Sequence, residues 1–505
     1  MSMRIKTRTI SCAVIFTLSS MMALGSGKHA AKAETVLVSA NGAGTGSGNG
    51  FSFAPVMSAD GRFVAFESLA ADLVPDDANG DFDVFVRDLK TGTTTLVSAN
   101  RAGTGSGNGF SFAPAISADG RFVAFESFAT DLVADDDANA DFDVFVRDLK
   151  TGTTTLISVN RAGGGSGNGF SSAPAISADG RLVAFESVAG DLVDNDTNGD
   201  IDVFVRDLKT DTTTLVSVNY AGTNSGNSQS RFPVFSADGR SVAFDSLAGD
   251  LVANDTNFNS DVFVRDLNTG TTTLVSVNSA GTDSGNNGSG LAAVSANARF
   301  VAFVSSASDL AGNDTNFNSD VFVRDLKTGT TTLVSVNRAG TDSGNGFSID
   351  AAISDDGRFV AFGSYAGDLV ANDTNGGGDV FVRDLKTGTT TLVSVNRAGT
   401  DTGNNGSFAR TISADGRFVV YESSASDLVV NDLNGHEDVF VCDMKTGTTT
   451  LVSVNRAGTR SGNGFSTAPA ISTDGRLVAF FSEASDLIAG DTNHDVDVFV
   501  RSLKR

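Results

Sequence analysis

The heptapeptide Asp-Val-Phe-Val-Arg-Asp-Leu recurs along this 505-residue chain, with small changes in the last two copies, and it constrains the fold more than any other feature. Successive copies begin 59 residues apart, apart from one interval of 60. A fixed period of this length is typical of solenoids, propellers and other arrays, so we expect similar units that pack side by side. The copies begin at Asp83, Asp143, Asp202, Asp261, Asp320, Asp379, Asp438 and Asp497.

Each repeat contains four strand-like runs and lacks helical periodicity. In the second repeat, Asp119-Gly120 separates the first two runs and is typical of a tight hairpin. The second and third runs are mostly apolar, as expected of strands covered on both faces, whereas the threonine-rich fourth run suits an exposed edge. This pattern predicts an all-β fold, an eight-bladed β-propeller of four-stranded antiparallel blades. The runs of this repeat are residues 113–117, 121–127, 143–149 and 153–159.

The two ends of the chain predict how the ring closes. The eighth repeat ends at Arg505, shortly after its third strand-like run. A run with the sequence of a fourth strand, Thr35–Asn41, stands near the N-terminus instead. We therefore expect the N-terminal strand to complete the last blade, so that the ring has no free sheet edge at its seam.

Two segments of the repeat carry a family resemblance. The sequences S-A-D-G-R-F-V-A-F (residues 117–125) and D-V-F-V-R-D-L-K-T-G (residues 143–152) resemble the TolB-type propeller repeat of bacterial exported proteins. The resemblance covers all of the chain after its first 33 residues and implies the propeller fold. Because that family includes periplasmic interaction platforms as well as propellers attached to hydrolases, the resemblance implies little about chemistry.

Residues 1–33 have the organisation of a secretory signal peptide. A basic segment precedes a mostly apolar stretch over residues 10–24, and Ala31-Lys32-Ala33 provides an A-x-A cleavage site. The alternative is a membrane anchor, but about 15 apolar residues fall short of the roughly 20 that span a bilayer. We expect cleavage before Glu34, a propeller over residues 34–505, and export to the periplasm or the extracellular space without membrane insertion.

The chain is strongly acidic, with a formal net charge of −24. Such a field repels nucleic acid and attracts cations, so nucleic-acid binding is set aside. Cys442 is the one cysteine after the leader, so no internal disulfide can form, and stability must come from packing or from metal. This cysteine replaces the arginine of one heptapeptide copy, and we interpret it as a tolerated substitution. We expect a monomer.

The loop between the second and third runs carries oxygen-bearing side chains at alternate positions. In the third repeat it reads D-T-N-G-D-I-D (residues 196–202), and we number these residues as positions 1 to 7. Positions 1, 3, 5 and 7 of the six stronger copies are Asp77, Asn79, Asp81 and Asp83; Asp137, Asn139, Asp141 and Asp143; Asp196, Asn198, Asp200 and Asp202; Asp255, Asn257, Asn259 and Asp261; Asp314, Asn316, Asn318 and Asp320; and Asp491, Asn493, Asp495 and Asp497. The two weaker copies are Asp373, Asn375, Gly377 and Asp379, and Asp432, Asn434, His436 and Asp438.

Alternating carboxylates and amides on a tight loop suit Ca²⁺, a hard cation that takes about six to eight oxygen ligands. The pattern resembles the opening of an EF-hand loop, but a strand begins at position 7 and position 6 is not a constant glycine. The alternative is that Asp and Asn form side-chain-to-backbone turns, which we expect of the aspartates that precede Leu-Val, such as Asp72, Asp191 and Asp250. Turns explain four acceptors in register less well, so we predict Ca²⁺ in the six stronger copies.

All long connections are expected on one face of the ring. The acidic loops and the glycine-rich loops, such as residues 103–109, lie there, whereas the other face has only Asp-Gly and Lys-Thr-Gly turns. The glycine-rich loops lack the Gly-Lys-Ser/Thr of a phosphate-binding loop, and we interpret them as connectors between blades. Function is expected on the long-loop face, because binding residues concentrate on loops that a rigid scaffold carries.

The repeat favours a binding module over an enzyme. Only His436 and His494 follow the leader, so catalysis based on histidine has few candidates. Paired carboxylates recur in every blade, whereas a glycosidase needs one acid and one base in an asymmetric site. Asn297-Ala298, in place of Asp-Gly, is the main irregularity and is interpreted as drift. We predict a non-catalytic, calcium-stabilised platform for a protein or glycan. The alternative is a lyase or hydrolase acting on an extracellular polysaccharide in the central funnel.

Overall fold

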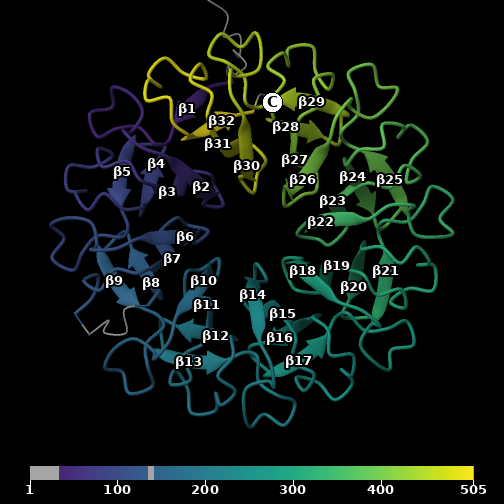
Figure 1. Cartoon of the computed structure of the whole chain (residues 1–505), viewed down its shortest axis with the longest axis horizontal. Helices are drawn as coiled ribbons and strands as arrows, with labels where there is room; N and C mark the ends of the chain where they lie inside the picture. Colours follow the sequence, from purple (N-terminus) through teal and green to yellow (C-terminus); the bar gives the residue numbers. More distant parts are fainter. Residues whose placement is uncertain (1–32, 135–140, 504–505) are drawn as a thin grey trace, which may run out of the picture. The chain divides into compact units, whose positions relative to one another are not determined.

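The structure is a computed structural model that describes residues 33–134 and 141–503, within one compact unit, Ala33–Leu503. Over these residues the chain forms eight four-stranded antiparallel sheets and no helix. Each sheet is one blade, and Figure 1 shows the blades following one another around a central axis. The predicted eight-bladed propeller is confirmed. The predicted leader lies outside the described residues, except for Ala33.

The strands are short and regular from blade to blade, and Figure 1 shows the first strand of each blade toward the middle. The first strands are β2 (Ser52–Met57), β6 (Ser111–Ile116), β10 (Ser171–Ile176), β14 (Ser230–Phe235), β18 (Ser289–Val294), β22 (Ser348–Ile353), β26 (Ser407–Ile412) and β30 (Ser466–Ile471). The second strands are β3 (Phe63–Ser68), β7 (Phe122–Ser127), β11 (Leu182–Ser187), β15 (Ser241–Ser246), β19 (Phe300–Ser305), β23 (Phe359–Ser364), β27 (Phe418–Ser423) and β31 (Leu477–Ser482). The third strands are β4 (Asp83–Asp88), β8 (Asp143–Asp148), β12 (Asp202–Asp207), β16 (Asp261–Asp266), β20 (Asp320–Asp325), β24 (Asp379–Asp384), β28 (Asp438–Asp443) and β32 (Asp497–Ser502). The fourth strands are β5 (Thr93–Leu96), β9 (Thr153–Leu156), β13 (Thr212–Leu215), β17 (Thr271–Leu274), β21 (Thr330–Leu333), β25 (Thr389–Leu392), β29 (Thr448–Leu451) and, in the eighth blade, β1 (Thr35–Leu37).

The N-terminal strand closes the ring, as predicted. β1 pairs antiparallel with β32, with Thr35 opposite Arg501. The Arg501 guanidinium donates to Thr35 Oγ1 at 2.6 Å. Beyond the strand, Ser39 Oγ donates to Asp497 Oδ1 at 2.5 Å. Because β2 also contacts β31, the first and eighth blades are neighbours.

The hydrophobic core lies between the blades rather than within one of them. One cluster joins Val84 and Val86 of β4 to Phe125 and Phe145 of the second blade, and equivalent clusters join the other neighbours. These apolar side chains face both ways from each sheet, which explains the nearly continuous apolar runs in the sequence. Burial of one such phenylalanine contributes roughly 1.5–3 kcal/mol. Each blade therefore depends on both neighbours for its stability.

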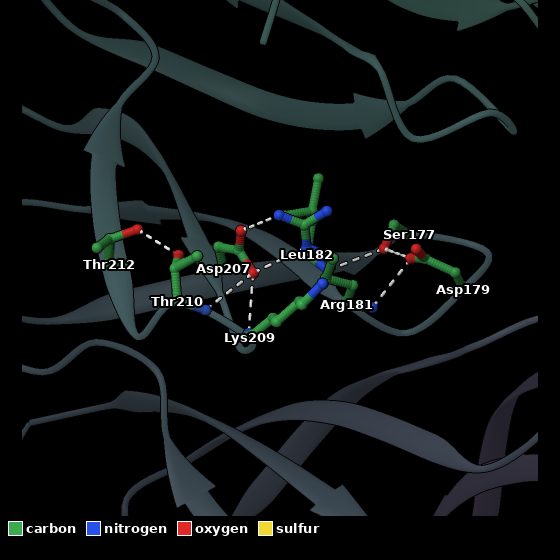
Figure 2. Close-up of polar contacts among 8 residues, drawn as sticks. All are labelled: Ser177, Asp179, Arg181, Leu182, Asp207, Lys209, Thr210 and Thr212. Carbon is green, nitrogen blue, oxygen red and sulfur yellow. Dashed lines mark hydrogen bonds and ion pairs between the residues drawn. The ribbon is translucent and has the colours of Figure 1, made fainter. Parts of the chain in front are cut away.

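The face with the short turns is held by an ion pair in most blades. In the third blade, shown in Figure 2, Arg181 Nε donates to Asp207 Oδ1 at 3.0 Å, and a second guanidinium nitrogen donates to Oδ2. The Lys209 N–H also donates to Asp207 Oδ1, at 2.9 Å. The Arg181 guanidinium and, to a smaller extent, the Lys209 N–H lower the pKa of Asp207 to about 2. Equivalent pairs are Arg62–Asp88, Arg121–Asp148, Arg299–Asp325, Arg358–Asp384 and Arg417–Asp443.

Blade 7 gives a physical reason for its cysteine. Tyr421 stands where the other blades have phenylalanine, and it shares a buried cluster with Cys442. Thr449 lies near both side chains, although the Tyr421 and Thr449 hydroxyls make no hydrogen bond of good geometry. In blade 1 the threonine at this place accepts from Arg87 Nη1 at 2.8 Å. The tyrosine hydroxyl thus reaches the space that an arginine head group takes elsewhere. Burial raises the pKa of the Cys442 thiol to about 11, so this thiol is a poor nucleophile.

Cys442→Arg is expected to lower the free energy of unfolding by about 1–3 kcal/mol, because the new side chain would overpack the space near Tyr421. Tyr421→Phe in the same chain should restore most of that loss, since the pair then matches the other blades. Denaturant unfolding of both variants and of Tyr421→Phe alone measures this coupling. A double variant no more stable than Cys442→Arg would show that the two substitutions are independent.

Candidate cation sites on the long-loop face

Two kinds of segment meet on the long-loop face. The acidic loop joins the second and third strands (residues 69–82 in blade 1), and the linker joins the fourth strand to the next blade (residues 97–110 after blade 1). The glycine-rich loops are these linkers. The backbone N–H of Arg101 donates to the Asp131 carbonyl of the next acidic loop at 2.8 Å. A Cβ on Gly107 would lie 2.7 Å from Ala129 and Leu132, so glycine allows this close packing.

The aspartates at positions 1 and 7 of the acidic loop form a buried carboxylate pair. In blade 3 these are Asp196, 6% exposed, and Asp202, 0% exposed. Asp202 Oδ1 accepts the Ser217 hydroxyl at 2.5 Å. Asp202 Oδ2 and both oxygens of Asp196 have no hydrogen-bond partner of good geometry among the described residues, although Ser225, the Asn198 N–H and Asp202 lie near enough to lower the pKa of Asp196. Buried carboxylate oxygens without partners are costly, and a cation would satisfy them.

Burial and mutual repulsion disfavour two negative charges in each pair. Burial raises the pKa of Asp202 to about 7, and the Ser217 hydroxyl and the neighbouring Asp196 charge act in opposite directions on it. Burial likewise raises the pKa of Asp196. Six other position 7 aspartates behave alike, with pKa values raised to about 7 for Asp83, Asp320, Asp379 and Asp497 and to about 8 for Asp261 and Asp438.

The pair recurs around the ring. Both position 1 oxygens lack a partner of good geometry in four further blades, within the described ranges: Asp255, Asp314, Asp373 and Asp432. In blade 2, Asp137 and Asn139 lie outside the described residues, whereas Asp143 is buried and accepts the Ser158 hydroxyl at 2.5 Å. Asp141 is exposed. The remaining pairs are Asp77–Asp83 and Asp491–Asp497.

The structure separates the four predicted ligand positions. Asn198 at position 3 uses its Oδ1 to accept the Asp200 N–H at 2.8 Å, and its amide nitrogen donates to the Gly226 carbonyl of the linker at 2.7 Å. Position 5 lies outside the pair: Asp200 is exposed, and the other described side chains there are half-buried or exposed. The turn interpretation therefore accounts for position 3, while positions 1 and 7 come together in the interior. Equivalent position 3 contacts are made by Asn79, Asn257, Asn316 and Asn493.

The aspartates before Leu-Val have a different partner from the predicted local turn. Asp191 Oδ1 accepts the N–H of Asn168 at 2.9 Å, and Asn168 belongs to the preceding linker. These carboxylates therefore fasten the linker to the acidic loop. The equivalent contacts are Asn49 to Asp72 and Asn227 to Asp250.

The two copies ranked weakest in the sequence keep the same carboxylate pair. Gly377 and His436 occupy position 5, which is not part of the pair, so their substitution leaves positions 1 and 7 unchanged. Sequence reasoning also missed the serine at the start of each linker, such as Ser98, whose hydroxyl donates to Asp83 at 2.5 Å. The constant spacing of 15 residues between this aspartate and serine was the available signal.

The pairs supply two carboxylates each, and the described part of the chain has no cluster of three or more Asp, Glu, His or Cys that could hold a metal. A divalent cation here would complete its coordination with hydroxyl or carbonyl oxygens and with water. Ca²⁺ accepts such mixed oxygen sets, and its charge matches that of the pair. The carboxylates at positions 1 and 7 would supply two of the oxygen ligands of such an ion.

A second set of carboxylates lies on the second strands near the first strands. The Glu67 carboxylate accepts the N–H of Ala113 in the next blade at 2.7 Å. Ala113 has a φ of +50° at a bulge in β6, which turns its N–H away from the sheet. These acids therefore have a structural role in holding the bulge of the next blade. The same contact joins Glu126 to Ala173, Glu186 to Phe232 and Asp245 to Leu291.

Blade 7 keeps this contact, because Glu422 accepts the Ala468 N–H, and it adds an ion pair, whereas Val304, Gly363 and Phe481 replace the acid in blades 5, 6 and 8. Arg410 Nε donates to Glu422 Oε2 at 2.8 Å, and the irregularity in β26 falls between Ala409 and Thr411. In blade 5, Ala298 takes the glycine conformation of the hairpin, with a φ of +53°, so that turn is retained. The ring is thus less uniform near its axis than near its carboxylate pairs.

No protein-family model matches the sequence, and no curated protein matches it. Among solved structures, a prolyl endopeptidase is 13% identical with a TM-score of 0.48, over 87% of this chain and 55% of that chain. The chain thus spans about half the length of that enzyme. The Dos1 propeller is 14% identical with a TM-score of 0.47, over 93% of this chain and 94% of that one. TolB from Acinetobacter baumannii is 15% identical with a TM-score of 0.32, over 78% and 77%.

TolB proteins are among the solved structures to which this chain is similar. Within residues 33–134 and 141–503, no helix has the length and apolar character that crossing a membrane requires.

Proposed function

We propose that the protein is an exported, calcium-stabilised propeller that acts as a binding platform for a protein or glycan through its long-loop face. The observation that supports this proposal is the recurring buried carboxylate pair with oxygens that lack partners, as at Asp196 and Asp202. Each pair lies where an acidic loop meets the linker to the next blade. A cation there would neutralise the repulsion and join the two segments, so that the loops present a fixed surface.

Calcium is expected to bind the metal-stripped protein with measurable heat and to raise its melting temperature. A site filled at 100 times its Kd contributes about 2.7 kcal/mol, so several sites together should produce a large shift. Isothermal titration calorimetry and thermal melts in chelator and in Ca²⁺ measure both effects. An unchanged melt together with no heat of binding would contradict the metal proposal.

A matched pair of variants locates the sites. Asp196→Asn with Asp202→Asn removes both charges of the blade 3 pair and should lower the stoichiometry by one. Asp194→Asn removes a charge from the same loop at a side chain that is 90% exposed, and should leave the stoichiometry unchanged. Equal loss in both variants would mean that the cations respond only to total charge.

The platform and the enzyme alternative give different results in binding and turnover assays. Retention on a glycan array or by a protein ligand in Ca²⁺, without turnover, supports the platform. Turnover on a polysaccharide panel, with no retention, would favour a lyase or hydrolase in the central funnel. The carboxylates resolved near that funnel, such as Glu67, accept backbone N–H groups, which supports a structural role for them.

A further inference from the structure

Two adjacent blades project a phenylalanine from the long-loop face. Phe258 is 86% exposed and Phe317 is 82% exposed, more than any other large apolar side chain in the described ranges. Both stand at position 4 of the acidic loop, in blades 4 and 5. Two large apolar side chains in the same loop position of neighbouring blades therefore face solvent together.

The backbone at this position makes phenylalanine an unfavourable choice. Phe258 has a φ of +59° and Phe317 a φ of +58°, in the left-handed region. The same position is glycine in blades 1, 3, 6 and 7, as with Gly199 at +73°. A residue with a Cβ costs roughly 1–2 kcal/mol in this conformation, and an exposed ring also loses favourable burial. Residues held in such a conformation cluster at functional sites, which makes the two phenylalanines candidates for a binding surface.

The linkers beside these two loops change in charge. The fifth residue of the linker is arginine in five linkers, for example Arg101, but Tyr220 and Ser279 stand there in the linkers that enter blades 4 and 5. Tyr220 is 69% exposed and adds a third aromatic side chain. This part of the face has therefore lost two positive charges and gained an aromatic ring relative to its neighbours.

Carboxylates are added at the same loops. Asp283 and Asp342 stand where the linkers of blades 1 and 2 have glycine. Asp283 Oδ1 accepts the Thr256 hydroxyl at 2.8 Å, and Asp342 Oδ1 accepts the Thr315 hydroxyl at 2.6 Å, which fixes both acids beside the loops that carry the phenylalanines. We define the aromatic–acidic patch as Tyr220, Phe258, Asp283, Phe317 and Asp342.

We propose that the aromatic–acidic patch docks a basic segment of a partner protein, in which apolar side chains cover Phe258 and Phe317. Lysine or arginine of that segment contacts Asp283 and Asp342 and lies against the aromatic faces. Aromatic residues dominate the energetic centres of protein interfaces, and a cation over an aromatic ring adds about 0.5–2 kcal/mol. This inference rests on the proposed platform, because it uses the same face.

Charge distinguishes this partner from the other candidates. A second copy of the chain or an anionic membrane would bring like charge to a surface that already carries added carboxylates, in a chain of net charge −24. A neutral glycan would gain nothing from the loss of arginine at Tyr220 and Ser279. A basic peptide gains from both the rings and the acids.

The test is a selection of randomised short peptides against the calcium-loaded full chain, with Phe258→Gly/Phe317→Gly as the counter-selected variant. Glycine restores the residue of the sister repeats, so the variant should fold with an unchanged or higher melting temperature. Selected peptides are expected to contain lysine or arginine beside an apolar residue and to bind the variant at least about tenfold more weakly. Asp283→Asn/Asp342→Asn should weaken them too, and His494→Gly, at position 4 of blade 8, should not.

Each other result overturns the inference. Peptides that bind Phe258→Gly/Phe317→Gly as well as the parent chain would show that the rings do not form the docking surface. If no peptide binds and the parent chain binds phosphatidylcholine vesicles but this variant does not, the patch binds lipid. If no peptide binds and the parent chain sediments as a dimer but this variant does not, the patch binds a second copy. The calcium-induced melting shift, measured in the same variants, reports separately on the metal sites and should not change.

Discussion

Without bound metal, the protein is expected to melt at a markedly higher temperature at about pH 5 than at about pH 8. Burial raises the pKa of Asp202 to about 7, and six equivalent aspartates behave in the same way. In the unfolded chain these aspartates have a pKa of about 4. Between these values the folded state binds more protons than the unfolded state, so stability falls as the pH rises. One pKa unit in each of the seven groups already amounts to about 10 kcal/mol.

The opposite face limits this trend at low pH. Arg181 lowers the pKa of Asp207 to about 2, so that ion pair contributes stability above about pH 4 and loses it as the pH falls toward the lowered pKa. Maximum stability of the metal-free chain is therefore expected between about pH 4 and pH 6.

Thermal melts across this range, in chelator and in Ca²⁺, measure the effect. Calcium should raise the melting temperature more at the alkaline end, because protons compete with the cation for the same oxygens. Asp196→Asn/Asp202→Asn should reduce the slope, and Asp194→Asn should not. A flat profile in chelator would contradict the burial of ionisable pairs in this ring.

Removal of residues 34–48 is expected to abolish cooperative folding of the ring. The deletion removes β1, the fully buried Val38 and the Ser39 hydroxyl that donates to Asp497. It also exposes the edge of β32, which becomes a template for aggregation. Loss of about 5 kcal/mol or more is expected, because core burial, sheet pairing and a buried polar contact disappear together.

A graft at the other end provides the control. A copy of Thr91–Ser98, the fourth strand of blade 1 with its turn, replaces Arg505 and follows Lys504 in the shortened chain. Blade 8 is then built from consecutive strands like the other blades, and the cooperative melt should return. Circular dichroism and light scattering follow the outcome. A shortened chain that melts like the full one without the graft would show that β1 is dispensable.

Sequence reasoning predicted the propeller well because the repeat reports the same structure eight times. Strand order, hairpin turns and inter-blade burial all follow from alternation of polar and apolar runs with fixed turn residues. The closing strand followed from counting, since the eighth repeat lacks a fourth run that Thr35–Leu37 supplies. Repetition thus replaced the ambiguity of any single short strand with a consistent pattern.

The site was less predictable because alternation along a loop does not say which side chains converge. Asn198 and Asp200 share the register of Asp196 and Asp202, yet a side-chain-to-backbone turn uses the Asn198 amide oxygen. The amide nitrogen of position 3 lies at the pair instead, and in blades 1 and 4 it donates to Asp83 and Asp261. The left-handed backbone of Phe258 depends on the same turn and has no signature in phenylalanine itself. Both features are set by local backbone geometry, which composition and spacing do not determine.

The pairing of β1 with β32 makes the fold circular in everything but covalent connection. Its seam has the strand order of the other blades and keeps their Arg–Thr and Ser–Asp contacts, here Arg501–Thr35 and Ser39–Asp497. A chain that began in another linker would therefore build the same core. Circularly permuted chains, joined across the present ends, are therefore expected to adopt the same fold. The position of the two termini determines only which blade would carry a segment attached to either of them.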